Sequence, residues 1–229
     1  MVELGRAIRY NIKYAHEKNY MSLYSLITTG NIMNKDFCFD KLVNELDPFD
    51  FETFNKSTIN FFAVVTNVET GNAEYIKITD ARQGLEVLRA SGSMPFVSKC
   101  VNINGVKYLD GAISDPIPIQ KAIDDGYEKI IVILTRPAGY RKTKDNMPYN
   151  IFYKKYSNFI KTAKNQPDIY NKTLDLIERY EKDGRIIVLR PSKKLKIARV
   201  EKNIEKLNAI YKLGVDDCKL TLNTIKEYL

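Results

Sequence analysis

Two runs of nearly continuous apolar residues place the strongest constraint on the fold. The runs lie at residues 129–135 (KIIVILT) and 185–190 (RIIVLR). Unbroken β-branched runs of this length are typical of strands buried on both faces, as in parallel sheets that helices cover. A helical pattern from about residue 167 to 182 separates them. The sequence therefore predicts an α/β fold, a three-layer α/β/α sandwich with a mostly parallel central sheet.

The size of the chain fits one domain. It has 229 residues, 44% of them hydrophobic, which is enough for one large core. No repeat or low-complexity linker divides it, so we expect a single domain over residues 1–229. No apolar stretch approaches the ~20 residues of a membrane-spanning helix, and the start (MVELGR) lacks a leader pattern. These features predict a cytoplasmic protein, with peripheral contact to a membrane as an option.

The charge of the chain favours anionic partners. The formal net charge is +8, from 36 Lys+Arg and 28 Asp+Glu, so nucleic acid and anionic lipid are both attracted at a distance. Most lysines stand beside acids, as at residues 178–183 (ERYEKD), which is typical of a solvated helix face. Residues 141–144 (RKTK) and 192–196 (SKKLK) are the best candidates for a membrane-facing patch. The 15 tyrosines accompany no nucleic-acid motif, so we expect no nucleic-acid partner.

Metal and cofactor sites are not indicated. Cys38, Cys100 and Cys218 are far apart and form no C-x-x-C pair, so they are predicted to be buried thiols rather than zinc ligands or disulfide partners. The acidic pairs at residues 124–125 and 216–217 are adjacent in helical segments, where neighbouring side chains point apart. The sequence therefore predicts no metal and no cofactor.

Local signals predict the remaining elements. A helix is expected over residues 4–24, followed by helical turns over 37–54 and a hairpin formed by 60–67 and 73–78. Asp80 is a plausible N-cap of a helix that runs to Ala90. The last segment, from about Arg199 to Leu229, is expected to be mostly helix.

A second hairpin leads to the most informative residue. Residues 97–103 and 106–109 flank Asn104-Gly105, the dipeptide best suited to a type I′ turn, so Asp110 follows a strand directly. A helix is then expected to begin at Pro116 and Pro118 with Ser114 or Asp115 as its cap, and to end at Gly126.

Asp110 has two possible roles. A carboxylate at the end of a strand, followed at once by glycine, lies where open α/β sheets place their sites, so Asp110 is a candidate general base. Asp-Gly is also common in turns, and Asp110 could simply cap a helical turn. Composition alone favours the turn.

Two ordered blocks resemble the patatin-like family of lipid acyl hydrolases. The first is Ala90-Ser91-Gly92-Ser93-Met94-Pro95. The second is Asp110-Gly111-Ala112, followed by Pro116 and Pro118. The family has a Ser/Pro block after a helix, then a hairpin, then Asp-Gly-Gly or Asp-Gly-Ala and a proline-containing helix start. The resemblance extends more loosely from the first helix to the C-terminus and is strongest to the bacterial, stand-alone branch.

The resemblance implies a serine–aspartate dyad that cleaves lipid acyl esters, as a phospholipase does. In such a dyad Asp110 would accept the proton of a serine in a Gly-x-Ser-x-Gly segment. The resemblance makes Gly111, Ala112, Ser91, Ser93 and Pro95 supporting residues, with both serines structural. The chain has one histidine, His16, in a Lys- and Tyr-rich segment, and it is poorly equipped for a Ser-His-Asp triad.

The nucleophile of that family is missing from the chain. No serine has glycine both two residues before and two residues after it, and no Gly-rich turn stands near the start. We therefore expect an N-terminally truncated patatin-like domain that lacks its first βα units, exposes apolar strand edges such as residues 130–134, and is inactive alone. The alternative is an inactive patatin-fold module that binds anionic membranes.

Overall fold

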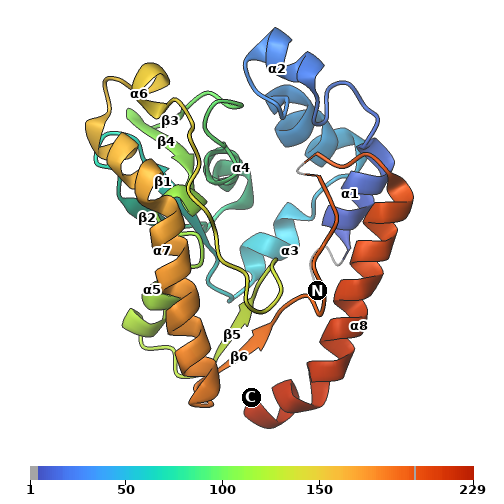
Figure 1. Cartoon of the computed structure of the whole chain (residues 1–229). Helices are drawn as coiled ribbons and strands as arrows, with labels where there is room; N and C mark the ends of the chain where they lie inside the picture. The colour runs from blue at the N-terminus through green and yellow to red at the C-terminus, as the bar shows by residue number, and fades with distance from the viewer. Residues whose placement is uncertain (1–4, 199) are drawn as a thin grey trace. The chain divides into compact units, whose positions relative to one another are not determined.

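The computed structural model describes residues 5–198 and 200–229, so Leu4 and Arg199 of the predicted helices lie outside the described residues (Figure 1). The chain forms two compact units. Unit 1 comprises Met1–Pro116 and Lys144–Gln166, and unit 2 comprises Ile117–Thr143 and Pro167–Leu229. Both units contain helices and strands, which confirms the α/β class. That the two act as one domain remains a prediction.

Unit 1 is built on an antiparallel sheet with the strand order β2-β1-β4-β3. Val65 of β1 lies opposite Asp110 of β4. The elements of unit 1 are α1 (Arg6–Tyr14), α2 (Leu23–Thr29), the π-helix η1 (Phe37–Leu46), α3 (Phe51–Lys56), β1 (Phe62–Asn67), β2 (Ala73–Lys77), α4 (Ala81–Ser91), β3 (Val101–Ile103), β4 (Val106–Asp110), the 3-10 turn η2 (Gly111–Ile113), α6 (Tyr149–Phe152) and the first part of α7 (Ser157–Lys182).

The local chemistry of unit 1 follows the sequence signals. Asn104 and Gly105 have φ values of 51° and 86°, as the predicted type I′ turn between β3 and β4 requires. The Gly105 amide donates to Asn102 Oδ1 at 2.9 Å. Asp80 caps α4 by accepting a hydrogen bond from the Gln83 amide at 2.9 Å. The hairpin before Asp110 is therefore confirmed.

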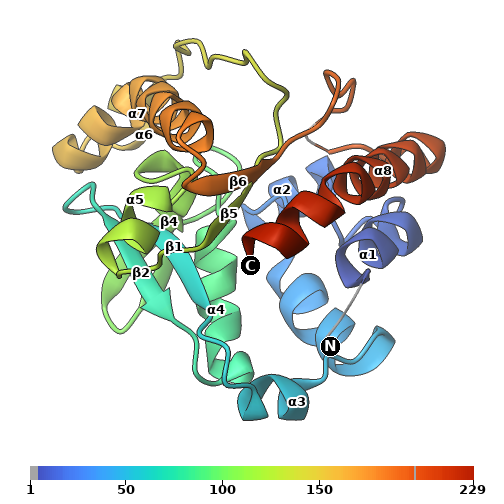
Figure 2. The same cartoon turned by 90° about the horizontal axis from the view of Figure 1, so that it is seen from below.

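Helices cover both faces of this sheet (Figures 1 and 2). Helix α4 packs on one face, where Ala90 joins the cluster of Val65 and Tyr108. The α6 and α7 segments pack on the other face, where Phe159 joins the cluster of Leu109. Since consecutive residues of a strand point to opposite faces, Tyr108 and Leu109 anchor β4 to two separate layers of helix.

Unit 2 contains a two-stranded parallel sheet. Its elements are α5 (Ile119–Asp124), β5 (Ile130–Ile133), the remainder of α7, β6 (Ile186–Leu189) and α8 (Ile204–Tyr228). Strands β5 and β6 pair in parallel, with Ile130 opposite Ile186. A core forms where Val132 of β5 packs with Leu174 and Ile177 of α7.

The prediction of one mostly parallel central sheet is not confirmed. Among the described residues the larger sheet is antiparallel, and the parallel pair β5-β6 is separate from it. The two apolar runs do pair in parallel, as their pattern predicted. The pattern could not show that the earlier strands join another sheet, because pairing depends on contacts between distant segments.

Two predicted helices differ from those observed. The predicted helix 4–24 is interrupted, because α1 ends at Tyr14 and the following turn buries Tyr20 against Tyr14 and Cys38. Helix α7 begins ten residues before the predicted start and contains Pro167. In both cases tertiary packing outweighs local propensity.

Candidate active site

Asp110 is held by hydrogen bonds of its own backbone. Its amide donates to the Ser93 carbonyl at 2.9 Å, and its carbonyl accepts from Thr66 Oγ1 at 2.8 Å. The half-buried side chain stands at the end of β4, where Oδ1 accepts the Ala112 amide at 2.9 Å and caps η2. The cap that the Asp-Gly pair predicted is therefore confirmed. It uses one acceptor site of a carboxylate, a group that offers about four, so capping is compatible with accepting a proton.

Gly111 is required by the close approach of strand β1. A Cβ atom at this position would lie 2.2 Å from the Val64 carbonyl oxygen and 2.4 Å from the Val64 carbonyl carbon. Both atoms belong to the backbone and cannot rotate away. Ala112 is exposed, and its carbonyl accepts Gln166 Nε2 at 2.9 Å, which ties η2 to α7. Gly111 thus lets a second strand approach the site closely.

The Ser/Pro block lies beside Asp110. Ser93 is only 4% exposed, and its hydroxyl donates to the Arg89 carbonyl at 2.7 Å. Ser91 ends α4, and Pro95 stands in the turn that follows. The hydrogen bond from the Asp110 amide to the Ser93 carbonyl joins the two sequence blocks directly. Ser93 has the contacts of a structural residue. The supporting role of Ser91, Ser93 and Pro95 at a catalytic site remains a prediction.

A polar network next to the site was missed in the sequence. Thr66 is fully buried, and its Oγ1 lies 2.7 Å from Ser114 Oγ. Asp115 accepts the Tyr75 hydroxyl at 2.5 Å. The prediction that Ser114 or Asp115 caps the next helix is wrong: α5 begins at Ile119 without a side-chain cap. A threonine inside the apolar run of β1 was the signal that a polar partner lies opposite.

The comparison with known proteins decides the family. The model of the patatin-like phospholipase family matches residues 5–123, just over half of the chain and all of the segment from α1 to the Asp110 turn. The chain belongs to the patatin-like phospholipase family. This match covers both the Ser/Pro block and the Asp-Gly-Ala block.

Two other matches extend beyond the family segment of this patatin-like chain. Residues 156–229 match a domain of unknown function, DUF6363. The uncharacterized protein YjjU of Escherichia coli (strain K12) is 24% identical over 223 residues, which cover 92% of this chain and 60% of that protein. The patatin-like chain thus spans about three-fifths of the length of this relative.

The histidine and the three cysteines of the patatin-like chain differ in their exposure to solvent. His16 is exposed, as expected of a surface residue. Cys38 is buried, and burial raises its pKa to about 12. The prediction that all three thiols are buried is wrong, since Cys100 is half-buried and Cys218 is exposed on α8. Within residues 5–198 and 200–229 no three His, Cys, Asp or Glu side chains gather as a metal site, and no helix there could span a membrane.

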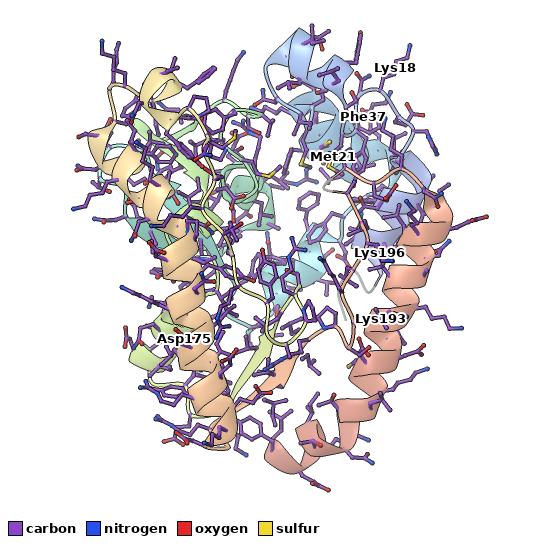
Figure 3. The ribbon with its side chains drawn as sticks, viewed as in Figure 1. Lys18, Met21, Phe37, Asp175, Lys193 and Lys196 are labelled. Carbon is purple, nitrogen blue, oxygen red and sulfur yellow. The ribbon has the colours of Figure 1, made fainter. Side chains whose placement is uncertain are left out.

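The two basic clusters differ in their surroundings. The Arg141 guanidinium forms ion pairs with Asp175 and Glu178 at 2.9 and 3.0 Å, so its charge is partly neutralised by α7. Lys193 and Lys196 are exposed on the segment between β6 and α8 (Figure 3). If the patatin-like chain has an anion-binding surface, the second cluster is the better candidate.

Proposed function

We propose that the chain carries the aspartate half of a lipid acyl hydrolase with a serine–aspartate dyad. The observation that carries the proposal is the junction of the two family blocks, in which Ser93 and Thr66 hold the backbone of Asp110 on both sides. A base fixed in this way loses little conformational freedom when a hydroxyl approaches it. Membership of the patatin-like phospholipase family supports a lipid acyl ester as the substrate.

In the proposed reaction Asp110 accepts one proton and returns it in each of two steps. The carboxylate takes the serine proton as the serine oxygen bonds to the acyl carbonyl carbon, and it returns the proton to the departing alcohol. Water then attacks the acyl-serine ester and gives its proton to the same carboxylate. The carboxyl group returns that proton to the departing serine oxygen as the fatty acid leaves. In this proposal the serine belongs to a Gly-x-Ser-x-Gly segment outside these 229 residues. The longer relative is consistent with such a segment.

The chain alone is expected to be inactive. Loss of the nucleophile of a serine hydrolase lowers kcat by roughly 10⁶, and Asp110 has no nucleophilic serine to activate within these residues. Hydrolysis of a short-chain p-nitrophenyl ester by the purified 229-residue chain, at a rate clearly above buffer, would contradict this expectation.

The test of Asp110 uses the product of the gene extended through any upstream Gly-x-Ser-x-Gly segment. Asp110→Asn should lower kcat/KM for the p-nitrophenyl ester by about 10²–10⁴-fold, since general bases contribute that much. Asp115→Asn is the matched control, because Asp115 is a nearby carboxylate whose partner is Tyr75. Equal activity of Asp110→Asn and the parent protein would remove Asp110 from the mechanism.

A second function is supported by the exposed lysines between β6 and α8. An inactive patatin-fold module could use Lys193, Lys194 and Lys196 to bind anionic membranes peripherally, at about 1 kcal/mol for each lysine near the surface. Co-sedimentation with vesicles that contain phosphatidylglycerol distinguishes the two functions. Salt-sensitive binding by a full-length product that hydrolyses no ester would favour the module.

A further inference from the structure

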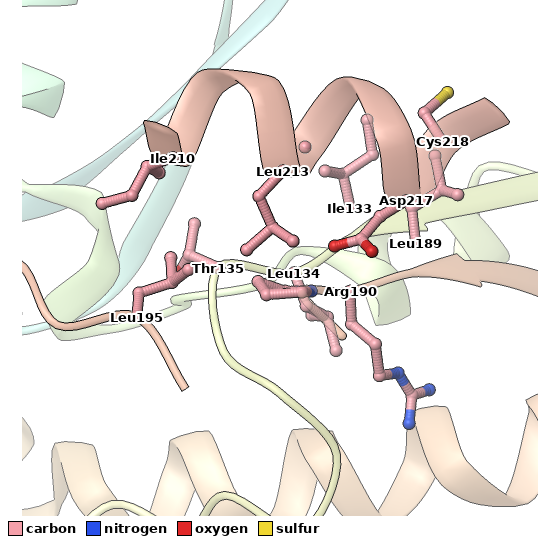
Figure 4. Close-up of a pocket in the computed structure, with 12 residues that line it drawn as sticks. Ile133, Leu134, Thr135, Leu189, Arg190, Leu195, Ile210, Leu213, Asp217 and Cys218 are labelled. Atoms are coloured by element: carbon pink, nitrogen blue, oxygen red, sulfur yellow. The ribbon is translucent and has the colours of Figure 1, made fainter. Parts of the chain in front are cut away.

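A cavity of about 350 Å³ lies in unit 2 between α8 and the ends of β5 and β6 (Figure 4). Its volume is at the lower end of the ~300–1,000 Å³ of small-ligand pockets. Its lining is largely apolar and includes Ile133, Leu134, Leu189, Ile210 and Leu213. Ile133 is 74% exposed although it belongs to a strand. An exposed apolar surface of this kind is typical of a site that binds an apolar ligand or partner.

Gly214 keeps one wall of the cavity open. It lies in the interior of the 25-residue helix α8, where glycine is less favourable than alanine. No atom lies within 4 Å of a Cβ atom built at Gly214, so close packing does not explain the glycine. The same position lines the cavity. An absent side chain therefore leaves space for a ligand.

A cationic hollow adjoins the cavity. Four lysines, Lys193, Lys194, Lys196 and Lys206, line an adjoining hollow that shares Leu195, Ile210 and Leu213 with the cavity. Figure 4 shows Leu195 and Ile210 at one end and Asp217 and Cys218 at the other. The Asp217 carboxylate accepts the Ser192 amide at 3.0 Å.

We propose that unit 2 binds a free fatty acid, with its chain in the cavity and its carboxylate toward the lysines. The apolar lining provides burial for methylene groups, and the lysines of the adjoining hollow attract the anionic head. The volume suits one acyl chain rather than the two of a diacyl lipid. This site goes beyond the proposed hydrolase function. Most of its lining lies in the region that matches the domain of unknown function, while the end of β5 and the residues after it supply Ile133, Leu134 and Thr135. Asp110 belongs to the other unit.

Calorimetric titration of the whole chain with octanoate, decanoate and dodecanoate, below their micelle concentrations, tests the site. We expect one molecule per chain and about fourfold tighter binding for each added methylene group, the factor that corresponds to burial of one such group. Dodecyltrimethylammonium, which has the same chain length and the opposite charge, should bind at least about tenfold more weakly. Equal affinity for octanoate and dodecanoate would overturn the proposal.

Two pairs of variants locate the ligand. Gly214→Leu should fill the cavity and weaken dodecanoate binding at least about tenfold, while Gly214→Ala adds one methyl group and should keep most of it. The double change Lys193→Glu with Lys196→Glu should weaken binding more than the matched change Lys161→Glu with Lys164→Glu, on exposed positions of α7 outside the cavity. Unchanged binding in Gly214→Leu, or equal loss in both lysine pairs, would refute the site. Because the lysines are exposed, their variants keep the test valid if Gly214→Leu does not fold.

Discussion

Gly111→Ala should loosen the strand pair that carries Asp110. The added methyl carbon would lie 2.2 Å from the Val64 carbonyl oxygen, 2.4 Å from the Val64 carbonyl carbon and 2.8 Å from Val64 Cβ. All three distances are far below van der Waals contact, and two of the atoms are backbone, so β1 and β4 must separate. Overpacking of a well-packed core costs about 1–3 kcal/mol. The depth of this collision places the expected loss near the upper end, which is a large part of the ~5–15 kcal/mol that stabilises a typical domain.

Native-state hydrogen exchange measures this loss at the strands themselves. Since ~1.4 kcal/mol corresponds to a factor of ten, a loss of about 3 kcal/mol should make peptides that cover β1 and β4 exchange on the order of 100-fold faster in Gly111→Ala. Gly92→Ala is the matched control, because its Cβ would meet only the Leu88 carbonyl, at an ordinary 3.7 Å. Exchange of the β1 and β4 peptides should change little in Gly92→Ala. Equal exchange rates in Gly111→Ala and the parent chain would refute the steric role of Gly111.

Two further predictions concern thiols and a buried tyrosine. Cys218 should react rapidly with a disulfide reagent near pH 8 and Cys38 very slowly, because Cys38 is buried and burial raises its pKa to about 12; Cys218→Ser should abolish the fast phase. Burial, and then the hydrogen bond to Glu74, raises the pKa of Tyr108 to about 12, above its ordinary value of 10.0. The stability from this protonated tyrosine is present below pH 10 and falls as pH rises from 10 to 12, so urea midpoints should decrease over that range, and less steeply in Tyr108→Phe.

Local signals in the sequence predicted the hairpin before Asp110 but not the sheet that holds it. Asn104-Gly105 and the Asp80 cap depend on a few neighbouring residues, and both appear as expected. The pairing of Val65 with Asp110 joins residues 45 positions apart in the chain. Register of this kind depends on which faces are buried in the folded protein, and no local pattern reports that.

The candidate site shows the same division between local and distant information. The sequence made Asp110 a candidate base through the resemblance to the patatin-like family, since strand, carboxylate and glycine by themselves favoured a turn. That role remains a prediction. The sequence also predicted that Ser114 or Asp115 caps the next helix, because both are good capping residues. Thr66 and Tyr75 use these side chains instead. Hydrogen bonds to these β1 and β2 side chains replace the local helix cap. The partners are distant in the chain and meet only in the folded protein.

Strand β5 links the sequence pattern to the proposed ligand. Its apolar run predicted two covered faces, and one is covered: Val132 is buried against α7, whereas Ile131 and Ile133 are 36% and 74% exposed. A strand that is apolar on both faces is expected to be buried on both faces in the functional protein. A ligand beside Ile133 would bury the second face of β5. Dodecanoate at 100 times its Kd should stabilise unit 2 by about 2.7 kcal/mol. It should therefore slow exchange of the β5 amides in the parent chain and leave them unchanged in Gly214→Leu. Protection that is equal in both proteins would show that the fatty acid lies elsewhere.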